Sequence, residues 1–170
     1  MSDHEEKEEA GTTPRDEREA LLMRLCGIAF AVYADECECE TTWAEPAPLP
    51  HAPASVLGVV SVRGRMRTLI DSARLFESLG LAFERRPAES DLRIASLRGD
   101  EQLALAFESG GPVRFTPKDL KPPPDSPPLP LLATVSRHGE TVYLLDPARL
   151  FEAAMQGTER RRQRGVNREP

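Results

Sequence analysis

The chain has 170 residues, 28 acidic and 22 basic, so its formal net charge is −6 and its length suits one domain. It has no run of about 18 apolar residues, which excludes a membrane-spanning helix, and its acidic balance disfavours nucleic-acid binding by the whole domain. The N-terminal stretch MSDHEEKEEA lacks the basic and apolar regions of a secretory signal. With only three cysteines, we expect a cytoplasmic protein without a disulfide framework.

Charge is concentrated at the two ends of the chain. Residues 1–19 carry eight acids and three bases with almost no apolar side chain, which predicts a disordered acidic tail. Residues 157–170 carry five arginines and two glutamates, which predicts a basic, flexible tail. We therefore expect the folded domain to span residues 20–156.

Short apolar runs separated by turn residues fill most of this span. Such spacing is typical of a mainly β domain, a barrel or a sandwich. The runs predict four hairpins: Ala20–Leu25 with Ile28–Tyr33, Val56–Val62 with Met66–Ile70, Asp91–Leu97 with Gln102–Phe107, and Leu131–Ser136 with Thr141–Leu145.

Two segments resemble each other at an offset of 75 residues. Leu69–Glu77 reads LIDSARLFE and Leu144–Glu152 reads LLDPARLFE, with seven of nine positions identical. Asp71 and Asp146 stand where helix N-caps belong, and this explains them better than a catalytic pair of carboxylates. Chance similarity is the alternative, but matching caps favour a duplication in which a short helix closes each of two β units.

Proline is concentrated in two segments, residues 44–53 and 121–130. Proline lacks the N–H that a central strand needs, so both segments favour an extended, polyproline conformation. We interpret them as stiff connectors within one domain, because folded-looking sequence flanks both. A proline-rich ligand for a partner protein, in residues 121–130, is the alternative.

Candidate chemistry is sparse. A metal site could be suspected at Cys37 and Cys39, with Cys26 and His51 nearby, but the spacing does not match the paired cysteines of structural zinc sites. Free thiols are the simpler interpretation. No nucleophile elbow or phosphate-binding loop is present, and no histidine has an evident fixed position. We therefore expect neither catalytic residues nor a metal or other cofactor; a metal protein or small enzyme using Cys37 and Cys39 remains the alternative.

One turn has a composition suited to protein contacts. Arg63–Gly64–Arg65 separates two apolar strands and follows Gly58. Arginine suits interfaces because its planar guanidinium makes forked hydrogen bonds and stacks on apolar surface. Ordinary hairpin turn chemistry explains the same residues equally well.

The sequence around this turn resembles the CheW family of bacterial chemotaxis adaptors. Leu49–Phe76 reads LPHAPASVLGVVSVRGRMRTLIDSARLF and follows a family pattern like P-x-x-V-x-G-x-x-N-L-R-G-x-x-x-P-V-x-D-L. Gly58, Arg63, Gly64 and Asp71 fall in register with it. The chain departs from the pattern at Ser61–Val62, at Thr68 in place of proline and at Ser72 in place of the final leucine. Cys39 takes the place of a glutamate that lies near the motif arginine in the family, a role open here to Glu38 or Glu40.

This resemblance implies a mainly β fold of two pseudo-repeated five-stranded β-barrel subdomains, each closed by a short helix. We expect the halves near residues 20–85 and 86–156 and partly interwoven. The implied function is a non-enzymatic adaptor that couples chemoreceptor cytoplasmic tips to the regulatory domain of a CheA-type histidine kinase, in the cytoplasm at receptor arrays. Nucleic-acid binding and membrane insertion are not expected. The residues implied in partner binding are Gly58, Val62, Arg63, Gly64 and Cys39.

Overall fold

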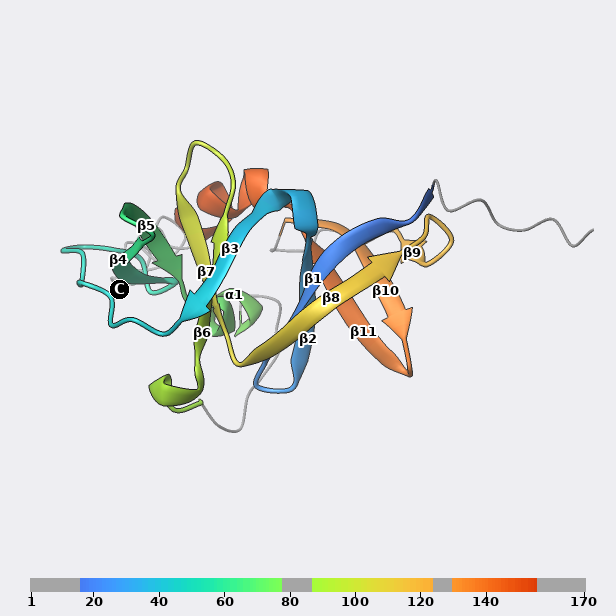
Figure 1. Cartoon of the computed structure of the whole chain (residues 1–170), viewed down its shortest axis with the longest axis horizontal. Coiled ribbons are helices and arrows are strands. Elements are labelled where there is room, and N and C mark those ends of the chain that lie inside the picture. The colour runs from blue at the N-terminus through green and yellow to red at the C-terminus, as the bar shows by residue number, and fades with distance from the viewer. Residues whose placement is uncertain (1–15, 78–86, 124–129, 156–170) are drawn as a thin grey trace, which may run out of the picture.

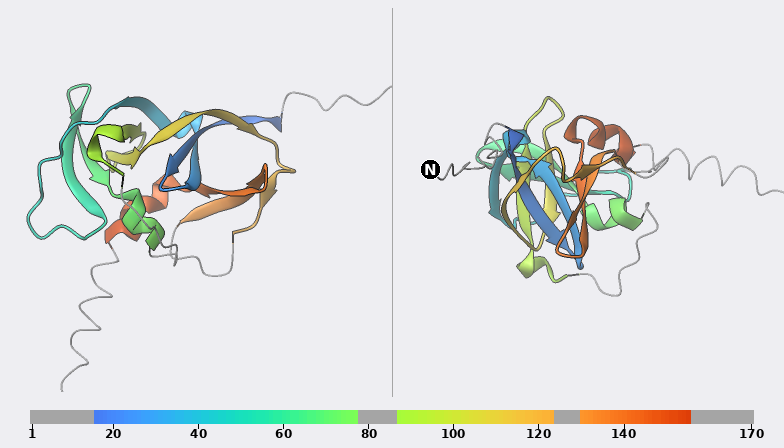
Figure 2. Two further views of the ribbon diagram at one scale, coloured as in Figure 1. Left: turned by 90° about the horizontal axis from the view of Figure 1, so that it is seen from below. Right: turned by 90° about the vertical axis from the view of Figure 1, so that its right-hand side faces the viewer.

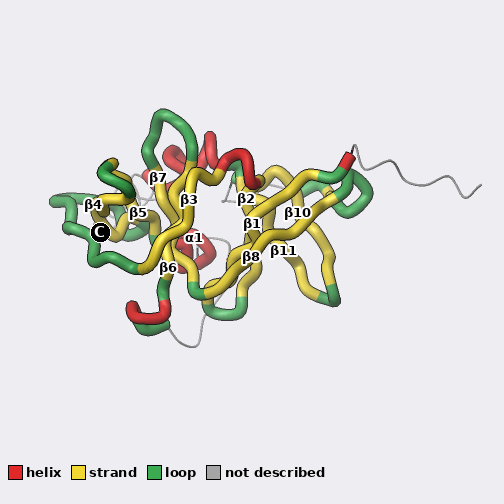
Figure 3. The backbone as a smooth tube through the Cα atoms, in the orientation of Figure 1, coloured by secondary structure: helices red, strands yellow, loops and turns green. Residues whose placement is uncertain are grey.

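The computed structural model describes residues 16–77, 87–123 and 130–155. Two β-sheets lie side by side along the long axis of the molecule (Figure 1), and strands make up most of the chain path (Figure 3). The expected mainly β fold with two subdomains is confirmed. The expected tails at residues 1–15 and 156–170 lie outside the described residues.

Strands from both ends of the chain form the larger sheet, and strands from its middle form the smaller one. The six-stranded sheet has the order β8-β1-β2-β11-β10-β9, with bounds β1 Arg18–Leu25, β2 Ile28–Tyr33, β8 Ser109–Phe115, β9 Leu120–Lys121, β10 Leu131–Arg137 and β11 Glu140–Leu145. The five-stranded sheet has the order β3-β6-β7-β5-β4, with bounds β3 Cys37–Thr42, β4 Val56–Val62, β5 Arg65–Ile70, β6 Arg93–Leu97 and β7 Leu103–Phe107.

All four predicted hairpins are confirmed as β1–β2, β4–β5, β6–β7 and β10–β11. In three of them, two residues with positive φ form the turn, as expected of type I′ turns that match the twist of the strands: Cys26–Gly27, Arg63–Gly64 and His138–Gly139. Strand β1 begins at Arg18, within the stretch expected to be a disordered tail, because residues 18–24 pair with β8. Strands β3, β8 and β9 were not predicted.

The two sheets repeat the same arrangement of strands. In each, an antiparallel hairpin (β4–β5 or β10–β11) pairs in parallel with a strand of a second hairpin (β7–β6 or β2–β1), which in turn pairs with an edge strand (β3 or β8). The second unit gains β9 as a sixth strand. Each of the halves 20–85 and 86–156 contributes its first hairpin to the sheet of the other, so the two halves are interwoven.

Each repeated LxDxARLFE segment ends a strand and begins a helix, as predicted. Helix α1 spans Ser72–Glu77, and a second helix covers residues 147–155. The Asp71 carboxylate accepts a hydrogen bond from the backbone N–H of Arg74, and the Asp146 carboxylate accepts one from Ala148. Both aspartates are therefore N-caps, which satisfies helix donors that otherwise have no partner. Two short 3₁₀ turns complete the fold, η2 at Ala34–Glu36 and η3 at Glu89–Asp91.

The main core lies where the two sheets and both helices meet (Figure 2). Phe30 of β2 packs on Phe76 of α1 with ring centroids 5.0 Å apart, and Leu150 of the second helix is fully buried in the same cluster. Smaller clusters lie on the remaining face of each sheet. This cluster contains side chains from both sheets, so the two units pack against each other through a common core.

Candidate functional site

The β4–β5 hairpin presents the predicted interface turn at its tip. Arg63 and Gly64 are exposed, with φ of 49° and 78°. Val62, one residue earlier, is only 4% exposed and belongs to the core cluster of the five-stranded sheet. Strand alternation explains the difference, since neighbouring residues point to opposite faces. Of these three predicted residues, Arg63 and Gly64 are exposed, and Val62 packs beneath them in the core.

Gly58 is buried at a bulge in β4 and has a structural role in this fold. Its φ is 146°, and a Cβ atom there would lie 2.2 Å from the carbonyl oxygen of Ala47. The proline-containing segment passes so closely because Ala47 and Val59 exchange two backbone hydrogen bonds of 2.8 Å. Glycine is thus required for the close approach of residues 46–47 to the strand.

Strand β3 contains a second bulge, and this decides where its acidic and thiol side chains lie. Cys37 pairs with Leu97 and Cys39 with Ser96, so Glu38 is the extra residue between them. Cys39 is half-buried and packs against the core cluster of the five-stranded sheet. Burial raises the pKa of the Cys37 thiol to about 11, which disfavours the thiolate that metal binding requires. Within the described residues, no group of three potential ligands could hold a metal ion.

Glu38 joins a buried arginine to an exposed one. The Arg67 guanidinium, 4% exposed, donates to the Glu38 carboxylate and, over 3.1 Å, to the carbonyl oxygen of Leu97. The other carboxylate oxygen of Glu38 lies 3.7 Å from Arg65, whose side chain is 71% exposed. Ser96 lies within 3.5 Å of the same carboxylate. Glu38 therefore pairs with arginines of β5, and in the described part of the chain no ion pair links it to Arg63.

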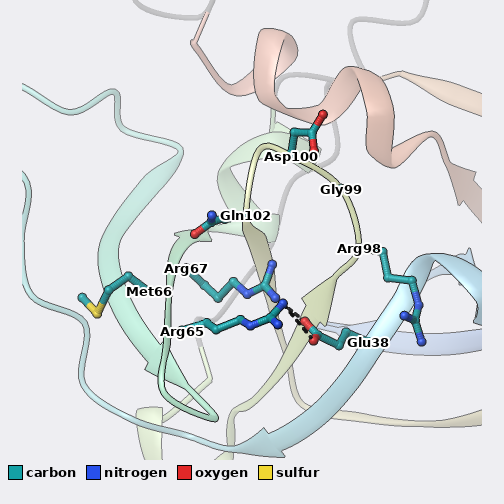
Figure 4. A pocket seen from close by; sticks show the side chains of 8 residues that line it. All are labelled: Glu38, Arg65, Met66, Arg67, Arg98, Gly99, Asp100 and Gln102. Carbon is teal, nitrogen blue, oxygen red and sulfur yellow. Dashed lines mark hydrogen bonds and ion pairs between the residues drawn. The ribbon is translucent and has the colours of Figure 1, made fainter.

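These side chains line a cavity of about 720 Å³ between β3, β5 and the loop that follows β6 (Figure 4). Strand β5 contributes residues 65–67 and the loop contributes residues 98–100 and Gln102. Backbone hydrogen bonds fix both ends of this loop, from Arg98 N–H to the Glu36 carbonyl (2.8 Å) and from Thr68 N–H to the Gln102 carbonyl (2.9 Å). The cavity is thus built on ordered backbone and is open at the end of the sheet.

The sequence of β5 itself indicates that one of its arginines is buried. Alternation along β5 places Arg67 on the same face as Leu69, which is fully buried. A buried arginine requires an acidic partner. From the sequence alone, Glu38 is expected only as a replacement for the family's glutamate, and Arg98 has no expected role.

Comparison with known proteins supports the assignment of the fold. A family model described as the CheW-like domain matches residues 19–155. The chain is 30% identical over 109 residues to the chemotaxis protein CheW of Rhizobium meliloti (strain 1021), an alignment covering 64% of this chain and 68% of the relative. The crystal structure of the scaffolding protein TtCheW from Thermoanaerobacter tengcongensis superposes with a TM-score of 0.68 at 15% identity, over 79% of this chain and 92% of that one.

The described part of the chain contains no helix long and apolar enough to cross a bilayer. The duplicated β units, each followed by a capped helix, occupy the same residues that the family model matches. Gly58 and Arg63 of the motif have positive φ and lie at the β4 bulge and in the β4–β5 turn. The chain belongs to the CheW-like domain family.

Proposed function

We propose that this protein is a non-enzymatic adaptor of a chemosensory pathway. The observation that carries the proposal is the family match across residues 19–155, which includes both sheets and both helices. The relatives are named as a chemotaxis protein and a scaffolding protein, which supports the general role of a chemotaxis scaffold. An adaptor works through its surfaces, so the relevant features are its exposed side chains rather than a reactive group.

The finer proposal is that the adaptor couples the cytoplasmic tips of chemoreceptors to the regulatory domain of a CheA-type histidine kinase. We place the kinase contact at the exposed turn Arg63–Gly64, with Gly58, Val62 and Cys39 shaping the strands that hold it. The receptor contact is proposed near the junction of the two sheets. Such a protein regulates only by binding the active and inactive states of its partners differently. We propose that it acts in the cytoplasm, at receptor arrays.

Co-purification tests this proposal directly. The full chain is mixed with the kinase regulatory domain and with the receptor tip encoded in the same genome, and complex formation is measured by size-exclusion chromatography. We expect a complex with the kinase domain that Arg63→Glu weakens. Arg137→Glu, a matched change at an exposed residue of the other sheet, should leave it intact. Failure of the unmodified chain to bind any such kinase or receptor would refute the proposed function.

A further inference from the structure

Positive charge gathers in the cavity beside the β4–β5 turn, although the chain as a whole is acidic. Three arginines line it, Arg65, Arg67 and Arg98, against two acids, Glu38 and Asp100. Figure 4 shows Arg65 and Arg98 on either side of Glu38, with Asp100 at the far end of the loop. The one carboxylate near the arginines is shared by Arg65 and Arg67, so guanidinium donors outnumber the acceptors within reach.

The duplication shows that the fold does not require a buried arginine here. Arg67 pairs with Val60 in the β4–β5 hairpin, and the equivalent pair in the β10–β11 hairpin is Val142 with Val135. Val142 is fully buried, so a valine fills this position in the other sheet. A buried ion pair adds little stability compared with apolar side chains of similar volume, because its desolvation is costly. The arginine therefore points to a role in recognition rather than in folding.

Arg67 fixes Glu38, and this leaves Arg65 and Arg98 available to a ligand. Arg65 is held only by the 3.7 Å contact to Glu38, and the Arg98 side chain has no ion pair within the described residues. Both arginines are exposed at the rim. Guanidinium groups at such positions recognise carboxylates through two parallel hydrogen bonds.

The exposed residues of β5 and the size of the cavity indicate the kind of ligand. Met66 is 56% exposed, but strand alternation turns its side chain to the face opposite Arg65 and Arg67, and Figure 4 shows it pointing away from Glu38. Methionine and arginine are both enriched where proteins bind proteins. The volume of the cavity, about 720 Å³, can accommodate several side chains of a protein segment and is much larger than one small ion needs.

We propose that this cavity binds an acidic segment of a partner protein, with carboxylates on Arg65 and Arg98. In identifying that partner as a chemosensory protein, the inference rests on the proposed function. In the family pattern, the three positions Arg65–Arg67 are unconstrained, so this cavity would distinguish the chain's partner from those of its relatives.

A peptide titration tests the inference without requiring the partner. Isotope-labelled full-length protein is titrated with a capped Glu-Leu-Glu-Glu-Leu-Glu peptide, with its Gln-Leu-Gln-Gln-Leu-Gln counterpart and with inorganic phosphate. Shifts of the arginine side-chain N–H and of backbone amides are followed by NMR. We expect the acidic peptide alone to shift residues 65–67 and 98–102, and the effect to weaken as salt screens the charges.

The variants decide whether the arginines carry the binding. Arg65→Ala/Arg98→Ala should weaken the acidic peptide at least about tenfold, since each charge-assisted hydrogen bond is worth about one factor of ten or more. Arg137→Ala is the matched control and should bind normally. Equal shifts with the glutamine peptide or with phosphate, unchanged binding by the double variant, or no shifts at all would overturn the inference. None of these outcomes bears on whether the chain binds a kinase, which the co-purification measures separately.

Discussion

Removing the charge of Glu38 should destabilise the protein more than removing its buried partner Arg67. The Arg67 side chain is 4% exposed, and its acceptors are the Glu38 carboxylate and the Leu97 carbonyl. Glu38→Gln leaves the guanidinium buried without a counter-ion. Arg67→Met instead leaves Glu38, whose side chain is 30% exposed and still lies 3.7 Å from Arg65. Loss of Glu38 should therefore reduce the stability of the fold more than loss of Arg67.

The magnitudes follow from that asymmetry. Breaking a buried ion pair from one side costs about 3–5 kcal/mol, because an uncompensated charge remains in the interior. Water reaches Glu38, so we expect a smaller loss of about 2–3 kcal/mol for Glu38→Gln, at or below the lower end of that range. Methionine keeps most of the packing of the Arg67 stem, and the valine at the equivalent position of β11 shows that an apolar residue fits. We therefore expect about 1 kcal/mol or less for Arg67→Met.

Urea unfolding followed by fluorescence measures both values. Trp43 is the single tryptophan and packs against the core cluster of the five-stranded sheet, so it reports on the region of the pair. The control is Glu40→Gln in the same strand, because Glu40 pairs with Arg93 at 3.8 Å with 32% and 44% exposed side chains. An exposed pair of this kind contributes at most about 1 kcal/mol. A larger loss for Arg67→Met than for Glu38→Gln would refute the reasoning.

Three further outcomes follow from single positions. Gly58→Ala should lower the free energy of unfolding by about 2 kcal/mol or more, because its Cβ would meet the Ala47 carbonyl oxygen. Gly64→Ala meets no atom within 4 Å, so it should cost only about 1 kcal/mol, from the positive φ of that residue. Thermal melting distinguishes the two variants. Arg63→Glu should leave stability within about 0.5 kcal/mol while weakening the kinase complex, and loss of folding in circular dichroism would contradict this. Cys37 in the native chain should alkylate about 100-fold more slowly at pH 8 than in the urea-unfolded chain, since burial raises its pKa from 9.0 to about 11; equal rates by mass spectrometry would show an accessible thiolate.

Local sequence pattern was sufficient for the hairpins but not for the edge strands. Residues 131–145 alternate apolar and polar side chains around His138–Gly139, so the strands and their turn are encoded within 15 residues. Strand β3 reads CECETT and β8 reads SGGPVRF, and neither has the apolar character of a strand. Both become strands by pairing with distant segments, β6 and β1. That information lies in the tertiary contacts, which override weak local preference.

The candidate site, like the fold, could be predicted only in part from the local sequence. The exposed Arg63–Gly64 turn was predictable, because a two-residue turn between apolar strands demands these backbone conformations. Val62 was expected to contact a partner and is instead a core residue, since a one-residue step along a strand changes the face. The Glu38–Arg67 pair depends on a bulge in β3 that shifts the register by one residue, and nothing in CECETT marks where it falls.

Because the hairpins are exchanged, each sheet contains strands from both halves of the chain. Strand β5 pairs in parallel with β7, which comes from the second half, and β11 pairs in parallel with β2, which comes from the first. Without its exchanged hairpin, each sheet would expose the edge of β5 or β11 and lose the core side chains that the hairpin contributes. Parallel strands require a long connection, and the exchange supplies it through the chain between the halves. The sheet that carries the β4–β5 turn is therefore built from strands of both halves of the chain, and it packs on the other sheet through the shared core.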